Sequence, residues 1–428
     1  MSSTSDISPP AATSARTADL RVLLILSALM AYAAASTDTY LPAFPAIGAA
    51  LKADPGLIQL TLSTYLIGFS LGQLAWGPLG DRFGRRKPII AGTLLFIAGS
   101  IGCALSDSVG QLIGWRVVQA LGACSGPVLA RAMVRDLYAR ERSAQVLSTL
   151  LLIMGVAPLL GPIIGGQILQ FASWRAIFWA LVLFGALSLV SLLALPETLP
   201  PSRRSAQRMS AVWRDYAMLL CDRKLLGYSA AGSFFYGGIF AYLAGSPFAY
   251  IEYYGVPERF YGFIFACNIF GMMGTNYLNT RLVMRHGTQR MFQVGAVTCA
   301  IAGVVLAMNA RFGWGGLAGL AVPLFFYIPM SGFIVANSVA AGLAAFPRQA
   351  GAASAVIGTM QYGSGVLSAA LVGWCADGTP WPMGWVVGIC GLGCVLTSVL
   401  MVRGKDKPAS AGPAGGGDAG TPERQAAA

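Results

Sequence analysis

Twelve long apolar stretches, joined by short polar segments, constrain the fold of this chain more than any other feature of the sequence. Each is at least about as long as the roughly 20 residues that a helix needs to cross the hydrocarbon core of a bilayer. Only 11% of the residues are charged and 56% are hydrophobic, so the chain lacks the polar surface of a water-soluble domain. The sequence predicts an all-α membrane protein whose transmembrane helices lie near 21–44, 57–80, 88–106, 109–133, 145–171, 174–195, 225–252, 259–284, 290–310, 313–345, 350–376 and 381–402.

A charged connector that contains prolines divides the stretches into two sets of six. A faint repeat accompanies this division, since Arg285–Arg290 can be laid on Arg82–Lys87 and each follows the second helix of its set. We therefore expect two pseudo-symmetric six-helix bundles, with polar or Gly-rich tails at both ends. The predicted divisions are a disordered cytoplasmic N-terminus at 1–20, an N-terminal bundle at 21–195, a cytoplasmic central loop at 196–224, a C-terminal bundle at 225–403 and a disordered cytoplasmic tail at 404–428.

Lys and Arg are concentrated in alternate connections, which is the pattern of cytoplasmic loops. Arg82–Lys87, Arg131–Arg142 and Arg203–Lys224 belong to this basic set, whereas the opposite loops carry few and nearly balanced charges. We expect both termini in the cytoplasm of a multi-pass protein in the bacterial inner membrane. The same bias accounts for the formal net charge of +12 without a nucleic-acid partner. Signal-peptide cleavage after Ala33–Ala35 is disfavoured, because it would leave an odd number of helices.

The residues that most often bind metals or perform acid–base catalysis are sparse. The eight cysteines are scattered without a C-x-x-C pair, and His286 is the single histidine. Cys390 and Cys394 share a helix face, but no histidine or carboxylate accompanies them, so small core residues are the favoured interpretation. We expect no metal, no cofactor and no enzymatic activity.

Asp38 is the acidic residue of greatest interest, because it lies inside the first apolar stretch. A carboxylate within the membrane costs roughly 2.5–3.5 kcal/mol on insertion scales and is rarely incidental. Burial favours the protonated form and a nearby cation favours the ionised form, so a change of surroundings can load or release a proton. These properties make Asp38 a candidate proton-coupling residue.

Arg116, in the fourth stretch, is a candidate partner for Asp38. At a rise of 1.5 Å per residue, both side chains lie roughly 9–12 Å below the outer ends of their helices. A functional pair is the favoured hypothesis. The alternatives are a static ion pair that fixes two helices, or an Asp38 close enough to the outer surface to stay hydrated.

Two further segments combine residue types that are unusual for a membrane chain. Gly77–Lys87 is a Gly-rich run with one acid and four cations between two apolar stretches, which predicts a tight cytoplasmic loop. Gly155–Gly166 packs glycines and prolines into one predicted helix. In a membrane bundle such residues allow helices to approach closely and bend, so a generic packing face is the alternative to a functional motif.

Across almost the whole span from Arg21 to Arg403, the sequence resembles the Bcr/CflA drug-resistance family, which are twelve-helix drug/proton antiporters of the major facilitator superfamily. The resemblance is highly specific for that fold and moderately specific for drug export. The segments that carry it are Asp38–Pro45, Gln59–Tyr65, Gly77–Lys87, Arg116–Gly122, Arg131–Asp136 and Gly155–Gly166.

The resemblance implies a role for each matching position. A latch on the cytoplasmic side would consist of Gly77, Asp81, Arg82, Gly84 and Arg85, with Asp136 as a charged neighbour. Asp38 and Arg116 match positions linked to proton coupling, although Ala31–Ala35 lacks a second acid that similar transporters often carry. The fifth-helix antiporter motif would consist of Gly155, Pro158, Gly161, Pro162, Gly165 and Gly166.

The expected function is proton-coupled efflux of small amphipathic drugs by alternating access, performed by a monomer that contains both halves of the cavity. Candidate substrate contacts are aromatic and amide side chains, for which helix packing is the alternative role: Tyr40, Tyr65, Gln73, Tyr236, Phe240, Tyr242, Asn268, Asn337, Gln361 and Tyr362. Three other functions stay open. They are a dedicated proton-linked exporter of a metabolite such as an amino acid, an uptake symporter, and an integral-membrane enzyme or receptor.

Overall fold

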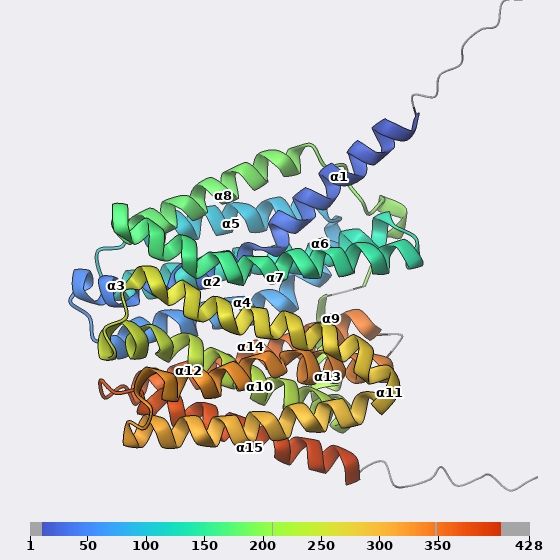
Figure 1. The fold of residues 1–428 in the computed structure, drawn as a ribbon. Helices are drawn as coiled ribbons and strands as arrows, with labels where there is room; N and C mark the ends of the chain where they lie inside the picture. The colour runs from blue at the N-terminus through green and yellow to red at the C-terminus, as the bar shows by residue number, and fades with distance from the viewer. Residues whose placement is uncertain (1–10, 208, 347–348, 404–428) are drawn as a thin grey trace, which may run out of the picture.

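The computed structural model describes residues 11–207, 209–346 and 349–403. Within these ranges the chain is helical and contains no strand, so the predicted all-α class is confirmed. The helices lie roughly parallel in two groups, one above the other in Figure 1. The predicted tails lie outside the described residues over 1–10 and 404–428, whereas residues 11–20 form the start of the first helix.

The N-terminal half begins with a helix that is broken twice. Pro42 interrupts the chain after Asp38, because proline has no backbone N–H to continue the helical hydrogen bonds. The elements of this half are α1 (Ala11–Met30), α2 (Tyr32–Asp38), η1 (Leu41–Ala43), α3 (Phe44–Leu51), α4 (Pro55–Phe83), α5 (Arg86–Ala104), α6 (Val109–Leu137), α7 (Arg140–Phe171) and α8 (Arg175–Leu193).

The C-terminal half repeats this arrangement with a different pattern of breaks. Gly287 has a non-helical backbone with φ of 78°, so the 55-residue α11 is two helices joined at a bend. The elements are α10 (Arg223–Pro247), η3 (Phe248–Tyr253), α11 (Glu258–Phe312), α12 (Gly316–Tyr327), η4 (Ile328–Met330), α13 (Ser331–Ala345), α14 (Ala350–Trp374) and α15 (Trp381–Arg403).

The helices of the described residues account for each predicted apolar stretch. Nine of them are long and apolar enough to cross a membrane, and the bent pair Arg21–Met30 with Tyr32–Leu51 makes a tenth. One of the nine, α11, covers two predicted stretches on either side of its bend. Gly155–Phe171, the apolar part of α7, covers the last. The predicted major facilitator architecture is therefore consistent with the helices observed.

The two halves touch mainly along two helix pairs. α4 packs against α14, and α7 packs against α11. Within each half the most extensive contacts join α4 and α5 to α6, and α11 to α15 and α10 to α14. The halves thus face each other across two seams, with space for a cavity between them.

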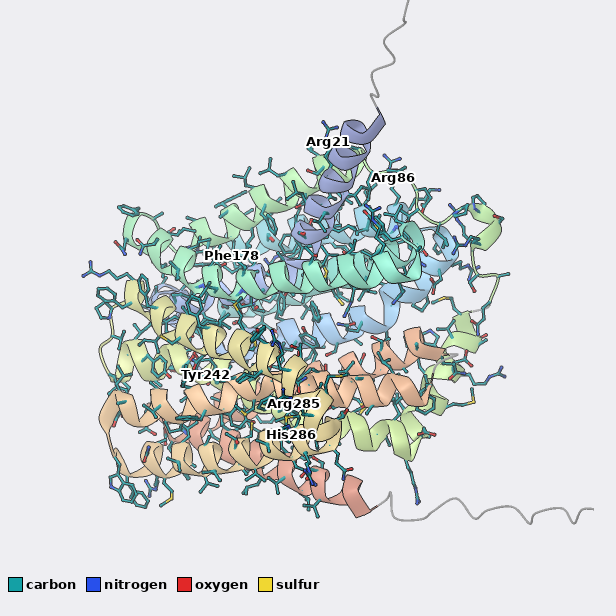
Figure 2. The ribbon with its side chains drawn as sticks, turned by 45° about the vertical axis from the view of Figure 1, so that its right-hand side comes forward. Arg21, Arg86, Phe178, Tyr242, Arg285 and His286 are labelled. Carbon is teal, nitrogen blue, oxygen red and sulfur yellow. The ribbon has the colours of Figure 1, made fainter. Side chains whose placement is uncertain are left out.

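The connector between the halves contains one element that the sequence analysis did not foresee. α9 (Met209–Cys221) follows the short η2 (Pro201–Arg203) and packs against α14 and α10. Its Tyr216 and Leu219 are buried with Val356 of α14. We call the end of the bundle that holds α9 the connector end. Arg21 and Arg86 lie toward this end, whereas Phe178 and Tyr242 lie toward the far end (Figure 2).

Candidate functional site

A cavity of about 310 Å³ lies between the two halves. Helices α1, α2, α4, α6 and α7 of one half and α10, α11, α13 and α14 of the other contribute to its walls. The walls are mainly aromatic and aliphatic, with a few amides and hydroxyls. Eight of the ten substrate contacts suggested by the sequence line the cavity: Tyr65, Gln73, Tyr236, Phe240, Tyr242, Asn268, Gln361 and Tyr362.

The other two suggested contacts, Tyr40 and Asn337, are not among the residues that line the cavity. The Tyr40 hydroxyl forms a hydrogen bond of 2.8 Å with Thr61 Oγ1, inside the N-terminal half. Asn337 Nδ2 donates to Asn279 Oδ1 at 3.1 Å, which links α13 to α11. Both side chains take part in helix packing, which was the alternative role considered for residues of this type.

Aromatic rings from three helices meet in the cavity wall. The Tyr362 ring lies 4.4 Å from Phe69, 5.5 Å from Phe240 and 5.9 Å from Tyr236, measured between ring centroids. These rings belong to α14, α4 and α10. Such a cluster offers flat apolar surfaces and ring edges to a planar solute.

Asp38 lies in the cavity wall at the end of α2 and is only 5% exposed. Its Oδ1 accepts a hydrogen bond from Thr37 Oγ1 at 3.0 Å. The fifth-helix motif places α7 directly against it. A Cβ atom on Gly161 would lie 2.9 Å from Asp38 Cβ, and one on Gly165 would collide with the Thr39 carbonyl oxygen. Glycine is required there because α7 passes the backbone of α2 so closely.

Arg116 is fully buried near Asp38, but the two side chains form no ion pair. Its Nη1 donates to the Ser36 carbonyl oxygen at 2.9 Å and to Gln119 Oε1 at 2.7 Å. The guanidinium lies 4.5 Å from the Tyr40 ring and 4.3 Å from the Tyr65 ring, while Nε and Nη2 have no hydrogen-bond partner. The structure thus brings Arg116 to the backbone of Ser36, two residues before Asp38, and places the cation against aromatic faces, which partly compensate its burial.

The loop between α4 and α5 is held by a charge cluster in which Arg85 and Asp136 are buried and Asp81 is exposed. Arg85 Nη1 donates to Asp81 Oδ1 at 2.6 Å, and Arg85 Nε donates to Asp136 Oδ2 of α6 at 2.7 Å. Gly84 adopts φ of 87°, and a Cβ atom there would lie 2.5 Å from Glu197 Oε2. Gly77 and Arg82 line the pocket beside this loop. The structure therefore brings the predicted latch residues together at the connector end.

Glu197 is part of this cluster, although the sequence analysis did not single it out. Its Oε1 accepts from the Arg85 backbone N–H at 2.8 Å, and its Oε2 accepts from the Arg86 backbone N–H at 3.2 Å. Burial raises the pKa of the Glu197 carboxyl, but three backbone N–H groups and the Arg204 charge outweigh burial and hold this pKa below its ordinary value. Glu197 therefore stays ionised and ties the end of α8 to the latch loop.

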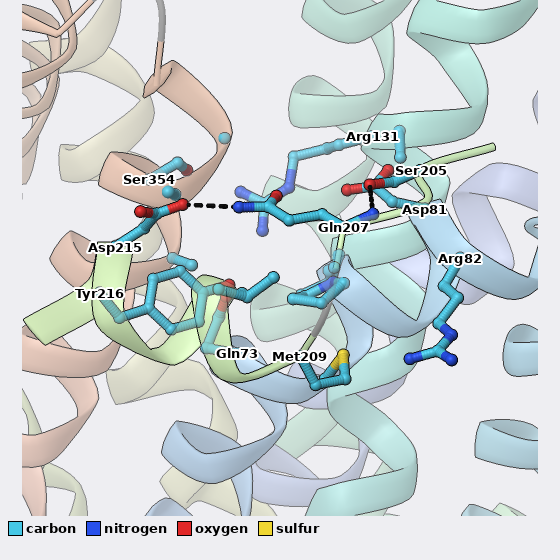
Figure 3. A pocket seen from close by; sticks show the side chains of 18 of the residues that line it. Gln73, Asp81, Arg82, Arg131, Ser205, Gln207, Met209, Asp215, Tyr216 and Ser354 are labelled. Atoms are coloured by element: carbon cyan, nitrogen blue, oxygen red, sulfur yellow. Dashed lines mark hydrogen bonds between the residues drawn. The ribbon is translucent and has the colours of Figure 1, made fainter. Parts of the chain in front are cut away.

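A second pocket, of about 220 Å³, lies at the connector end and adjoins the cavity (Figure 3). Gln73, Arg131 and Ser354 line both spaces. We call it the connector pocket. At the far end, Gly56 of α4 is in close backbone contact with Gly373 of α14. A separate far-end pocket of about 260 Å³ shares no lining residue with the cavity. In this conformation the cavity therefore communicates with the connector end.

Arg131 is a cavity residue that the sequence analysis placed in a basic segment and in the Arg131–Asp136 resemblance, but did not name as a candidate substrate contact. α6 continues to Leu137, and the Arg131 side chain turns back along it, since Nε donates to the Pro127 carbonyl oxygen at 2.7 Å. The sequence signal that could have identified Arg131 was its position within the continuing helix.

Among the described residues, no group of three or more His, Cys, Asp or Glu side chains could hold a metal ion.

Comparisons with known proteins agree with this geometry. The sequence profile of the Major Facilitator Superfamily matches residues 24–369. The chain is 33% identical to a bicyclomycin resistance protein homolog of Haemophilus influenzae, over 85% of this chain and 90% of that protein. It is 31% identical to a chloramphenicol resistance protein of Pseudomonas aeruginosa, over 84% and 86% of the two chains. It is 30% identical to the multidrug resistance protein MdtL of Shigella flexneri, over 89% and 95%.

Solved structures share the fold at low sequence identity. The xylose transporter XylE of Escherichia coli superimposes with a TM-score of 0.69 at 16% identity, over 92% of this chain and 99% of that one. The nucleoside transporter NupG gives a TM-score of 0.72 at 13% identity, over 90% and 98%. The chain therefore belongs to the major facilitator superfamily of membrane transporters, within its Bcr/CflA drug-resistance family, and is not an enzyme.

Proposed function

We propose that this chain exports small amphipathic drugs across the bacterial inner membrane in exchange for protons. The observation that carries the proposal is a large aromatic cavity with a buried carboxyl, Asp38, in its wall. A cavity with little fixed charge suits chemically varied apolar solutes. The drug-resistance names of the relatives support the same substrate class.

Proton coupling centres on Asp38 and Arg116. A protonated Asp38 is neutral and compatible with an empty apolar cavity, whereas an ionised Asp38 favours a cationic solute or a closer approach of Arg116. Because Arg116 already contacts Ser36, two residues from Asp38, a small shift of α2 against α6 would change the charge balance. Drug and proton would thus compete for one site, as antiport requires.

Alternating access would occur by rocking of the two halves. We assign the connector end to the cytoplasm, because the basic loops gather there. Drug would enter through the connector pocket and leave when α4 and α14 part at the far end. The Asp81–Arg85–Asp136 cluster would latch the cytoplasmic side in the outward-facing state. Since one chain supplies both cavity walls, the functional unit is a monomer with cytoplasmic termini.

The test uses everted membrane vesicles that contain a pH-sensitive dye. Drug addition to wild type should raise the internal pH, because efflux into the vesicle carries protons out. Asp38→Asn should abolish this response. Asp54→Asn is the matched control, since Asp54 is an exposed acid in the loop before α4 and should leave the response intact. If correctly inserted wild type responds to no drug, a dedicated metabolite carrier becomes the better interpretation.

A further inference from the structure

The cavity is bipolar. Among its described lining residues, Asp38 and Arg131 are the two charged side chains. The remaining lining groups are apolar, aromatic or neutral polar. Charged groups inside a membrane bundle usually serve a transported solute or an ion, because each is costly to bury. A cavity with one acidic and one basic side chain therefore indicates which charged groups its ligand carries.

The two charges lie at different depths. Arg116 of α6 marks the level of Asp38, since its Nη1 contacts the Ser36 carbonyl oxygen. Arg131 lies on the same helix roughly 22 Å closer to the connector end, at a rise of 1.5 Å per residue between Arg116 and Arg131. The Arg131 side chain then turns back toward the membrane centre. The aromatic cluster of Tyr362 fills the wall between the charges.

Both charges are available to a ligand. Arg131 uses Nε for the Pro127 carbonyl oxygen, and its two terminal nitrogens have no partner among the described residues. The acids of the adjoining connector pocket are engaged elsewhere. Asp81 Oδ1 accepts from Arg85, and Asp215 Oδ2 accepts from Gln207 Nε2 at 2.9 Å (Figure 3). Two free terminal nitrogens on a fixed guanidinium match the two oxygens of a carboxylate.

We propose that this cavity selects amphoteric solutes, with an acidic group bound by Arg131 and a basic amine bound by Asp38. The proposal rests on the proposed export function and adds a substrate class to it. Arg131 is the specificity-determining residue, because Asp38 must also accept a proton whereas Arg131 serves the ligand alone. The acidic group faces the cytoplasm, and the aromatic wall receives the ring system between the two charged groups.

The test compares three probes in energised everted vesicles: norfloxacin, which carries a carboxylate and an amine, its methyl ester, and its N-acetyl derivative. Uptake without an energy source is subtracted as passive leakage. Charged hydrogen bonds are stronger than neutral ones, so wild type should move norfloxacin about tenfold faster than either derivative. In Arg131→Gln the preference for the acid over the ester should disappear. Arg131→Lys keeps the positive charge but lacks the paired terminal nitrogens of the guanidinium, so it should retain part of the preference for the acid.

Arg290→Gln is the control, because Arg290 is an exposed arginine of α11 that lines neither the connector pocket nor the cavity. It should keep the full preference. The proposal is overturned if wild type moves ester and acid equally, or if Arg131→Gln retains the preference. Wild type that exports chloramphenicol but none of the three probes would overturn this inference alone. Wild type that exports no drug at all would remove the proposed function, and this inference with it.

Discussion

At the scale of single residues, Glu197 anchors the latch loop through backbone N–H groups rather than through an ion pair with its closest cation. Arg204 Nη2 lies 3.9 Å from Glu197 Oε2, whereas the Arg85 backbone N–H lies 2.8 Å from Oε1. Hydrogen bonds to an ionised acceptor are stronger than neutral ones. The conformation of the Gly77–Lys87 loop therefore depends on a residue of α8's C-terminal extension, outside the loop that carries the motif.

Replacing Glu197 with Gln should lower the melting temperature of the purified protein by about 2 °C at pH 7, because the ionised acceptor is lost. The folded pKa of Glu197 lies below its unfolded value, so its stabilisation is present above the unfolded pKa of about 4.3 and is lost as pH falls through the folded pKa. The difference between wild type and variant should therefore shrink below about pH 4.

Thermal melting of both proteins in detergent between pH 3.5 and pH 8 checks this expectation. Glu252→Gln is the control, because Glu252 is exposed at the far end and should show no difference at any pH. A Glu197→Gln deficit that stayed constant with pH would mean that the carboxylate charge is not the cause.

Part of the site could be predicted because the sequence surroundings of a residue already show that it is unusual. The rest depends on contacts with other helices. Asp38 stands out in the sequence because an acid inside an apolar stretch needs no partner to be noticed. Glu197 and Arg131 sit where charges are common, at helix ends beside basic loops. Whether such a residue faces lipid headgroups, the latch or the cavity depends on helix rotation and on contacts with other helices, which a single sequence does not specify.

At the scale of elements, α7 shows what the glycines of the fifth-helix motif do. The helix passes α2 and α11 at once, since Gly165 faces the Thr39 backbone and a Cβ atom on Gly166 would lie 2.8 Å from the Glu258 carbonyl oxygen. Small residues on two faces allow one helix to serve as a seam within its own half and between the halves. The motif therefore packs α7 against the chain beside Asp38, so the packing role and the proposed functional role involve the same residues.

Gly165→Ala should reduce drug-dependent proton movement at least tenfold, because the new methyl group would force α7 away from α2 beside Asp38. Gly155→Ala is the control, because it adds the same methyl group elsewhere on α7. No atom lies within 4 Å of a Cβ at Gly155, and Ala favours a helix more than Gly does, so this variant should keep full activity. Equal losses in both variants, measured in vesicles with matched expression, would contradict the packing explanation.

The connector helix α9 marks the limit of prediction at this scale. The apolar stretches are visible because each fills a bilayer, whereas α9 has 13 residues and carries charges between its apolar side chains. Its buried residues, Tyr216 and Leu219, pack on α14 rather than on lipid. The Tyr216 hydroxyl also donates to the Leu74 carbonyl oxygen of α4 at 3.3 Å. Short amphipathic helices of this kind become recognisable only when their partner surface is known.

At the scale of the whole molecule, a rocking motion requires different behaviour from the two ends of the contact between α4 and α14. α4 and α14 touch along their length, from Gly56 and Gly373 at the far end to Leu74 and Val356 near the connector end. Opening the far side must separate the first pair while the second stays together. The cavity then loses its path through the connector pocket and gains one through the far end, which is the essence of alternating access.

A cross-link at the far end should therefore stop export. A Cβ atom on Gly373 would lie 3.4 Å from Gln59 Cβ, close to the separation of about 3.8 Å in a disulfide. It would also lie 2.9 Å from the Gly56 carbonyl oxygen, so the Gly373→Cys single variant reports the effect of the small backbone shift that this contact requires. The double variant Gln59→Cys with Gly373→Cys, made with Cys375→Ser to remove the exposed native thiol nearby, should lose drug export on oxidation. Reduction should restore it, and each single cysteine variant should be insensitive to both treatments.

The outcome discriminates between a rocking molecule and a static pore, because the disulfide leaves Asp38, Arg131 and the cavity walls unchanged. Drug binding measured on the oxidised double variant should therefore persist while transport is lost. That combination locates the defect in the separation of α4 from α14, not in recognition. Continued export by fully cross-linked protein would show that the far ends of these helices need not part, and a route between α7 and α11 would then be the exit to examine.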